Sequence, residues 1–172
     1  MAYRFSFQNQ SVEGIIGQFA TQVPRETRFW SSMVDYFREP PESGTDPVIY
    51  DVFSLPYGDS SAELMAVLTV LYGGQIGGER FHTKGHFHTE PDGPEYVIVL
   101  AGRGILERGQ RDGTIEQSIM EPDTHIMVPP GQAHRVVNVT DEPLLFVSLC
   151  SAAVGHDYAS ITTLGWATPK NR

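Results

Sequence analysis

The chain has 172 residues, with 12 Lys and Arg against 21 Asp and Glu, and a formal net charge of -9. This length suits one domain with a sizeable core and is too short for two ordinary domains. An acidic chain without a basic run is a poor match for a nucleic-acid backbone, and no stretch of about 18 apolar residues is present that could cross a membrane. We therefore expect one domain and no nucleic-acid or membrane partner.

The first residues and the cysteine content indicate the compartment. The segment MAYRFSFQNQ lacks the charged and apolar regions of a signal peptide. Cys150 is the only cysteine, so an intrachain disulfide is impossible, and its apolar setting predicts a buried, unreactive thiol. We expect a cytoplasmic protein.

Residues 1–47 are predicted to form an N-terminal extension that packs on a barrel formed by residues 48–172. Within the extension, a helix is predicted over residues 25–37, because apolar residues recur there at spacings of three and four. The segment EPPESGTDP at 39–47 then breaks this helix. The apolar positions of the predicted helix are Phe29, Trp30, Met33, Val34 and Phe37.

From residue 48 onward the pattern changes to short strands. Runs rich in Val, Ile, Leu, Phe and Tyr are separated by turns every roughly 8–12 residues, which is typical of an antiparallel sandwich or barrel. Two hairpins are predicted, one over EYVIVLAGRGILE at 95–107 with GRG at its turn, and one over GQRDGTI at 109–115 with Asp112-Gly113 at its turn. Strands are expected at 48–55, 63–72, 79–88, 95–102, 104–109, 114–120, 125–130, 134–140 and 143–150.

Three imidazoles and one carboxylate occupy positions that this pattern brings together. His86 and His88 project to one side of a strand while Phe87 turns to the other. Glu95 opens the next strand after the turn TEPDGP, and His134 follows the turn PPGQA. Because nitrogen ligands with one carboxylate suit a divalent transition metal, we predict one such ion per chain, bound by these three histidines and Glu95.

Two segments carry a family resemblance. Residues 85–102, beginning Gly85-His86-Phe87-His88, resemble the first cupin motif, and residues 129–138, with the pattern PxGxxHxxxN, resemble the second. The resemblance implies a mainly all-β fold, a cupin jelly-roll antiparallel barrel with a short N-terminal helix and the metal inside its open end. The sequence departs from the family in a longer loop between the second histidine and the glutamate, and in Asp123, where glycine is usual.

Within the cupins, residues 31–165 are similar to the archaeal-type glucose-6-phosphate isomerases, most specifically in TKGHFH at 83–88. This implies interconversion of glucose 6-phosphate and fructose 6-phosphate, with Glu95 as the catalytic base and His156 transferring a proton during ring opening. The metal would stabilise an oxyanion or anchor the substrate. A metal-bound carboxylate is a poorer base, so a metal-assisted hydride shift stays open beside the enediol route.

The same resemblance implies a substrate-binding set and a departure from it. Val97 and Cys150 stand where the family often has tyrosines, so hydrogen bonds to the sugar are expected to differ. His82 and His125 fit no ligand position and are expected to be structural or surface residues. The implied phosphate contacts are Thr69, Thr83, Lys84 and Gly85, and Tyr36 and Tyr158 are expected to line the sugar pocket.

Two other interpretations stay open, an iron-dependent cupin dioxygenase and a non-catalytic sugar-binding cupin. Iron is the expected metal, with manganese, nickel and zinc as alternatives. The resemblance implies a sugar phosphate as the small-molecule partner and a homodimer as the assembly.

Overall fold

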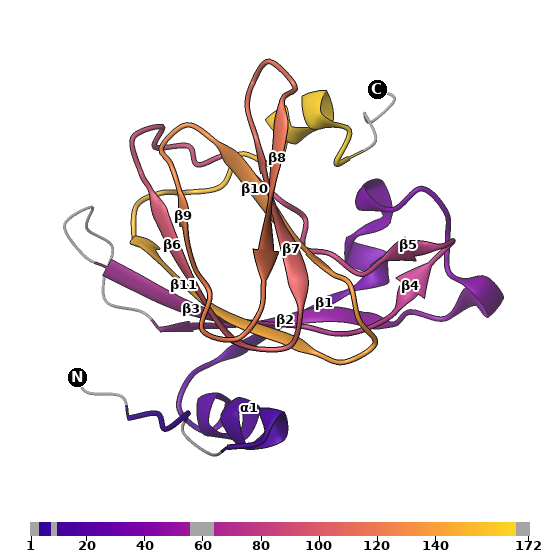
Figure 1. The fold of residues 1–172 in the computed structure, drawn as a ribbon. Helices are drawn as coiled ribbons and strands as arrows, with labels where there is room; N and C mark the ends of the chain where they lie inside the picture. Colours follow the sequence, from indigo (N-terminus) through magenta and orange to yellow (C-terminus); the bar gives the residue numbers. More distant parts are fainter. Residues whose placement is uncertain (1–3, 8–9, 56–63, 168–172) are drawn as a thin grey trace.

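The computed structural model describes residues 4–7, 10–55 and 64–167, and the account below concerns these residues. They form two facing antiparallel sheets and a small two-stranded ribbon (Figure 1). The six-stranded sheet has the order β1-β2-β3-β11-β6-β9, the three-stranded sheet the order β10-β7-β8, and β4 pairs with β5. The strands are β1 (Arg25–Phe29), β2 (Val48–Leu55), β3 (Leu64–Leu71), β4 (Gln75–Ile76), β5 (Glu79–Arg80), β6 (Glu95–Ala101), β7 (Gly104–Gly109), β8 (Ile115–Met120), β9 (His125–Val128), β10 (Ala133–Asn138) and β11 (Leu144–Ser151).

The main core lies between the two larger sheets. Strands β6 and β10 alternate buried and half-buried residues, as expected where one face of a strand meets the core and the other does not. Val97, Leu106 and Val136, from opposite sheets, belong to one buried cluster. This arrangement confirms the predicted mainly β fold, an antiparallel barrel of the cupin jelly-roll type.

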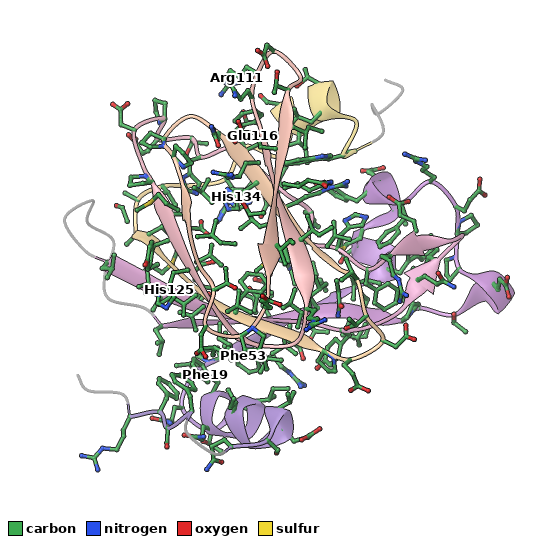
Figure 2. The ribbon with its side chains drawn as sticks, in the orientation of Figure 1. Phe19, Phe53, Arg111, Glu116, His125 and His134 are labelled. Atoms are coloured by element: carbon green, nitrogen blue, oxygen red, sulfur yellow. The ribbon has the colours of Figure 1, made fainter. Side chains whose placement is uncertain are left out.

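A short N-terminal helix, α1 (Val12–Ala20), covers the outer face of the six-stranded sheet (Figure 1). It begins after Ser11, whose side-chain oxygen accepts a 3.1 Å hydrogen bond from the backbone N–H of Gly14. Phe19 of α1 is buried against Phe53 of β2, with ring centroids 6.2 Å apart (Figure 2). The helix therefore gives the sheet a second buried layer on the side away from the barrel interior.

The predicted helix over residues 25–37 is wrong. Arg25–Phe29 is a strand, paired antiparallel with β2, and the chain continues as two short 3-10 turns, η1 (Trp30–Ser32) and η2 (Val34–Tyr36). Met33 and Phe37 are buried, but Phe29 and Val34 are exposed, so the apolar spacing does not describe one helical face. The edge of β2 offers hydrogen bonds to the backbone of residues 25–29, and strand pairing wins over the local periodicity. Two further 3-10 turns are η3 (Glu42–Gly44) and η4 (Ser160–Leu164).

One of the two predicted hairpins is correct. Strands β7 and β8 pair from Gly104 with Met120 to Gly109 with Ile115, as expected of a hairpin with its turn in GQRDGTI at 109–115. The hairpin over 95–107 is wrong, because β6 pairs with β11 and β9 while β7 pairs with β10 and β8. The intervening glycines carry the chain from one sheet to the other, with φ 81° at Gly102.

The predicted strand over 79–88 is regular only at its start. After β5 the chain makes isolated antiparallel bridges, at His82 with Val137, at His86 with His134 and at Phe87 with Asp157. Gly85 has a φ of 73° and interrupts the extended conformation between the first and second bridge. This irregular segment runs along β10 and carries two of the predicted metal ligands.

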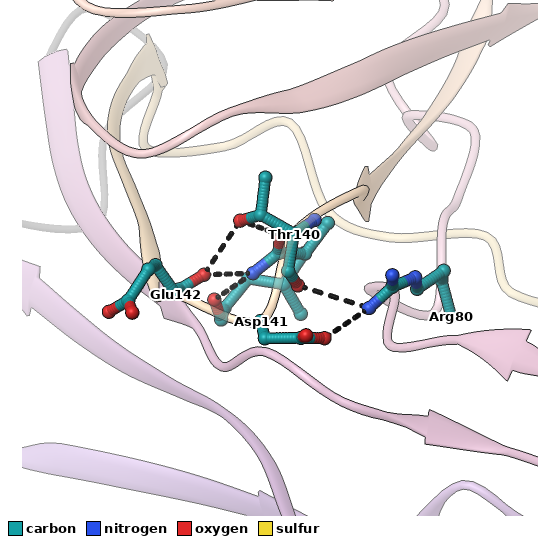
Figure 3. Close-up of polar contacts among 6 residues, drawn as sticks. Arg80, Thr140, Asp141 and Glu142 are labelled. Carbon is teal, nitrogen blue, oxygen red and sulfur yellow. Dashed lines mark hydrogen bonds and ion pairs between the residues drawn. The ribbon is translucent and has the colours of Figure 1, made fainter.

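The turn after β10 is organised by the buried side chain of Asn138, the last residue of the second motif. Its amide nitrogen donates to the carbonyl oxygens of Leu71 (3.1 Å) and Glu142 (2.8 Å), and its amide oxygen accepts from the backbone N–H of Thr140 (2.9 Å). Figure 3 shows these contacts beside a salt bridge of 2.6 Å between Arg80 and Asp141. The asparagine thereby joins the end of β3 to the turn that begins β11.

Strand β1, from the predicted extension, is hydrogen-bonded to β2, from the predicted barrel, so the extension contributes a strand to the large sheet. The boundary at residue 47 stays a prediction, and the outer ends of both segments, 1–3 and 168–172, lie outside the described residues. Within the part of the chain that the structure describes, no helix has the length and apolar character needed to cross a bilayer.

Candidate metal centre and its cavity

Four side chains from three parts of the chain meet inside the barrel. His86 and His88 come from the segment before β6, Glu95 is the first residue of β6, and His134 lies near the start of β10. One potential ligand atom from each lies within 4.8 Å of the others. Figure 2 shows His134 in the interior, between the two sheets.

The backbone explains why the histidines converge. His86 and His134 face each other across an antiparallel bridge, with N–H to O distances of 3.2 and 3.0 Å, and their ring centroids are 4.5 Å apart. The rings of His86 and His88 are 5.4 Å apart, whereas Phe87 points away into a cluster with Ile161 and other apolar residues. The predicted division of these three side chains between two faces is confirmed.

The carboxylate of Glu95 lies among the imidazoles. Its Oε2 atom is 3.3 Å from Nε2 of His88 and 3.2 Å from Nε2 of His134. Nδ1 of His88 lies 2.7 Å from the carbonyl oxygen of Gly93, a distance that places a proton on Nδ1. Nε2 of His88 therefore keeps its lone pair toward the centre of the group.

The four residues fit a metal ion. Nε2 of His86 is buried and, among the described residues, has no hydrogen-bond partner. An unpartnered buried nitrogen of this kind is unfavourable by about 1–3 kcal/mol, and a cation at the centre of the group would satisfy it. Three imidazoles and one carboxylate are donors that divalent transition metals accept.

Burial and mutual contact set the charges in the group. Burial alone would raise the pKa of Glu95, but the neighbouring His134 and His88 outweigh it and hold that pKa well below its usual range. Burial and the adjacent His134 lower the pKa of His86 well below that of free imidazole. Burial also opposes the charged form of His88, but its bonds to Glu95 and to the Gly93 carbonyl raise its pKa. The group thus holds an ionised carboxylate facing imidazole nitrogens.

A cavity of about 220 Å³ opens beside this group. Its floor is the inner face of the six-stranded sheet, and its sides include β10, the 83–86 segment and the chain after β11. Nine of the predicted site residues line it: Thr69, Thr83, Lys84, Gly85, His86, Glu95, His134, His156 and Tyr158. A space of this size takes a single small molecule.

Two aromatic residues after β11 connect the cavity to the metal group. The ring of His156 lies 4.2 Å from that of His86, and the ring of Tyr158 stacks on His156 at 5.7 Å. Burial lowers the pKa of His156, so this imidazole is neutral near pH 7 and can accept a proton. Both residues, predicted from the GHDY segment, therefore lie next to the metal group.

Lys84 and Thr83 are placed by the irregular segment before β6. The Lys84 ammonium lies 5.4 Å from the ring centroid of Tyr36 and 5.8 Å from that of Tyr158, within the range of cation-π attraction. The hydroxyl of Thr83 accepts a 3.0 Å hydrogen bond from the backbone N–H of Val136. Tyr36 is not among the described residues that line the cavity, and its contact with the sugar stays a prediction.

The remaining predicted residues divide between the cavity and the core. Cys150 lines the cavity as a buried thiol, and burial together with Glu95 raises its pKa to about 12, as expected of an unreactive cysteine. Val97 belongs to the apolar core and does not line the cavity. His82 is buried against Phe37, and His125 is exposed and bonded to the Tyr96 hydroxyl, so neither is a ligand.

The cavity also contains residues that the sequence did not single out. Glu26 and Arg28 come from β1, and Tyr50 comes from β2. Glu26 and Arg28 were missed because a helix was predicted over residues 25–37, and only a strand places residues 26 and 28 on the same face. The segment RETRF has no alternation of apolar and polar residues, so the local sequence contained no clear signal for this strand.

Fold and site together define a cupin barrel with a buried His/Glu group that could bind a metal ion. Residues 34–168 match the family described as glucose-6-phosphate isomerase (GPI). The chain belongs to this family.

Curated relatives support the same assignment. The glucose-6-phosphate isomerase of Pyrococcus furiosus is 37% identical over 142 residues, which cover 83% of this chain and 71% of that protein. The enzyme of the same name from Pyrococcus horikoshii is 41% identical over 122 residues, or 71% of this chain and 65% of that protein. The Thermococcus litoralis enzyme is 38% identical over 138 residues, covering 80% and 68%. The chain thus spans about two thirds of the length of these relatives.

Solved structures give a weaker likeness. Oxalate decarboxylase from Bacillus subtilis at pH 4.6 has a TM-score of 0.49 at 21% identity, covering 69% of this chain and 28% of that chain. The Cupin_2 domain of an XRE family transcriptional regulator from Enterobacter cloacae has a TM-score of 0.46 at 22% identity, covering 60% and 96%.

Proposed function

We propose that this chain is a metal-dependent isomerase that interconverts glucose 6-phosphate and fructose 6-phosphate. The observation that carries the proposal is the buried His86–His88–Glu95–His134 group at the side of a small cavity. Membership of the glucose-6-phosphate isomerase family supports the substrate. Hydroxyl groups, an ammonium and a neutral imidazole line the same cavity, as a phosphorylated sugar requires.

His86, His88, Glu95 and His134 would hold one divalent transition metal, with iron as the expected ion. When bound, such a metal polarises the oxygen atoms of a carbonyl or hydroxyl group. The depressed pKa of Glu95 suits a ligand, because a carboxylate must be ionised to bind.

The reaction moves one hydrogen between C1 and C2 of the sugar and one proton between the oxygens on these carbons. Glu95 is our candidate for the carbon-bound proton, although its contacts with His88 and His134 weaken it as a base. His156 is neutral and next to the metal group, so it can move a proton during ring opening. Direct hydride transfer between C1 and C2 is the alternative that does not need Glu95 as a base.

We assign the phosphate of the substrate to four residues that offer hydrogen-bond donors to the cavity. Thr69 is buried on β3, Thr83 and Lys84 lie on the irregular segment, and Gly85 offers a backbone N–H. A side chain at residue 85 would collide with the neighbouring chain, because a Cβ there would lie 2.8 Å from the Cβ of Arg135, so this backbone position requires glycine. We also predict a homodimer and a cytoplasmic location. Light scattering, which measures the mass of the assembly, tests the homodimer.

A coupled assay under anaerobic conditions tests the proposal. We expect glucose 6-phosphate to form from fructose 6-phosphate without oxygen, to stop after a chelator and to resume after a divalent metal is added. Oxygen consumption with a reducing substrate, without isomerisation, would indicate a dioxygenase instead. Binding of the sugar phosphate without turnover would indicate a non-catalytic sugar-binding protein.

A further inference from the structure

Strand β1 places one cation in the wall of the cavity. In the register of β1 with β2, Glu26 is opposite Val52 and Arg28 is opposite Tyr50. All four residues line the cavity, whereas Arg25 and Thr27 face the other side of the sheet, where both contact Asp51. Residues 25–29 lie outside the matched family segment 34–168, so the family match does not include this cation.

Arg28 has two neighbours in the cavity lining, Glu26 and Tyr50. Its guanidinium forms an ion pair with Glu26, and Glu26 and Tyr50, its partner across the strand pair, both favour its charged form. Tyr50 also lines the cavity, and burial raises the pKa of its hydroxyl to about 12, so this hydroxyl stays uncharged. The cavity lining thus contains a second cation, Arg28, in addition to Lys84.

The ion pair of Arg28 is asymmetric. The Arg28 side chain is 26% exposed, whereas that of Glu26 is 61% exposed. Burial works against the charge of Arg28, but Glu26 and Tyr50 outweigh it and raise the pKa of the guanidinium, so it stays charged. An ion pair with an exposed carboxylate of this kind is weak, because solvent screens the attraction. A dianion that enters the cavity can replace it.

We propose that Arg28 determines the specificity for the phosphorylated end of the sugar, and that Glu26 holds the guanidinium in place until the phosphate replaces it. The proposal rests on the proposed function. A planar guanidinium can donate two parallel hydrogen bonds to a phosphate, which an ammonium cannot do in the same way. Arg28 would then approach the phosphate from β1 and Lys84 would approach it from the irregular segment.

The test compares metal-loaded wild-type protein with Arg28→Met, Arg28→Lys, Glu26→Gln and the control Arg25→Met. Two quantities are measured, the KM for fructose 6-phosphate and the Kd of inorganic phosphate by calorimetry. We expect Arg28→Met to raise both by roughly 10–100-fold, the effect of a lost charged hydrogen bond, with kcat little changed. Arg28→Lys should give values of KM and Kd between those of the wild type and those of Arg28→Met. Glu26→Gln should lower both constants, because it removes a negative charge that competes with the phosphate. Arg25→Met should leave both unchanged.

Unchanged KM and Kd in Arg28→Met would overturn the inference, as would an increase of both constants in Glu26→Gln. If Arg28→Met does not fold, as shown by the loss of its thermal unfolding transition, the other two variants test the inference. KM and Kd should then rise in Arg28→Lys and fall in Glu26→Gln. If the wild-type protein binds phosphate but does not isomerise the sugar, the proposed function fails. The phosphate titrations of the variants then still decide the role of Arg28.

Discussion

Glu95 contacts two imidazoles through one carboxylate oxygen and is buried with them, so its roles as ligand and as base compete. Glu95→Gln keeps the size and one oxygen donor but removes the charge. If Glu95 is the base, kcat should fall by about 10²–10⁴-fold even when excess metal restores occupancy, and steady-state kinetics on metal-saturated protein measures this.

Turnover in deuterated water provides an independent measurement on the wild-type enzyme. An enediol route with an exchanging base introduces deuterium at the transferred position, whereas hydride transfer does not. Near-normal turnover of Glu95→Gln, together with no deuterium in the product, would remove Glu95 from the base role and leave it as a ligand.

His88 should control how metal binding depends on pH. Its pKa is raised in the folded protein through Glu95 and the Gly93 carbonyl, so its protonated form stabilises the metal-free protein at low pH, and this stability is lost as the pH rises through the raised pKa. Metal binding must remove that proton, whereas the lowered pKa of His86 leaves this ligand already neutral. Metal affinity should therefore fall as the pH is lowered from about 8 to about 6. Calorimetry in two buffers should detect about one released proton per metal below the pKa of His88, and a pH-independent affinity would contradict this.

At the scale of elements, the irregular segment before β6 depends on Gly85. Its φ is 73°, and a Cβ would lie 2.8 Å from the Cβ of Arg135 and 2.9 Å from the Trp166 ring. Gly85→Ala should lower the free energy of unfolding by about 1–2 kcal/mol for the left-handed conformation and by a further 1–3 kcal/mol or so for overpacking. Gly113→Ala is the matched control, because Gly113 has a φ of 91° but open space around it. Equal losses in denaturant unfolding of the two variants would show that the predicted overpacking is absent.

Helix α1 should contribute stability without contributing to the site. Phe19 is buried and stacks on Phe5 with ring centroids 3.9 Å apart, whereas Phe7 is 42% exposed. Phe19→Ala should therefore lower the free energy of unfolding by about 3–5 kcal/mol, and Phe7→Ala by about 0.5 kcal/mol or less. Metal content should be unchanged in both, because α1 lies on the outer face of the six-stranded sheet. Loss of metal from folded Phe19→Ala protein would contradict this separation.

The strands were predictable where turn residues mark their ends, as in β7 and β8 on either side of Asp112-Gly113. The pairing of β6 was not predictable, because a short glycine turn can close a hairpin or carry the chain to another sheet. Residues 25–29 were predicted wrongly for a related reason: their strand exists through β2, which the local sequence does not contain. Helix α1 was missed although Ser11 caps it, since nine residues with two glycines give only a weak apolar pattern.

The candidate site also has a part that was predicted from local sequence, the metal ligands, and a part that was missed, the cavity residues of β1. His86, His88, Glu95 and His134 were found because their spacing, relative to turns and strand ends, reflects the geometry of one barrel end. Arg28 was missed because it reaches the cavity only through the pairing of β1 with β2. Residues placed by local backbone geometry were thus predictable, and those placed by long-range strand pairing were not.

In the whole molecule, the two faces of the six-stranded sheet have different roles, one in stability and one in the candidate site. The outer face of the six-stranded sheet packs on α1, and its inner face forms the cavity floor. The smaller sheet contributes His134 through β10, which also pairs with the segment that holds His86. The metal group therefore joins two sheets and one irregular segment, so a bound ion should stabilise the whole fold as well as enable turnover. At a metal concentration 100 times its Kd the gain is about 2.7 kcal/mol.

The most direct test of a metal-dependent isomerase is a titration of metal-stripped protein in which bound metal and glucose 6-phosphate formation are measured in the same samples. We expect the rate to rise in proportion to bound metal and to saturate at about one ion per chain, as the four-residue group predicts. His134→Ala should lose most of its metal and turnover, whereas His125→Ala, at an exposed position of β9 and well away from His134 in Figure 2, should match the wild type. Undiminished turnover in the stripped protein, or in His134→Ala without metal, would contradict the account.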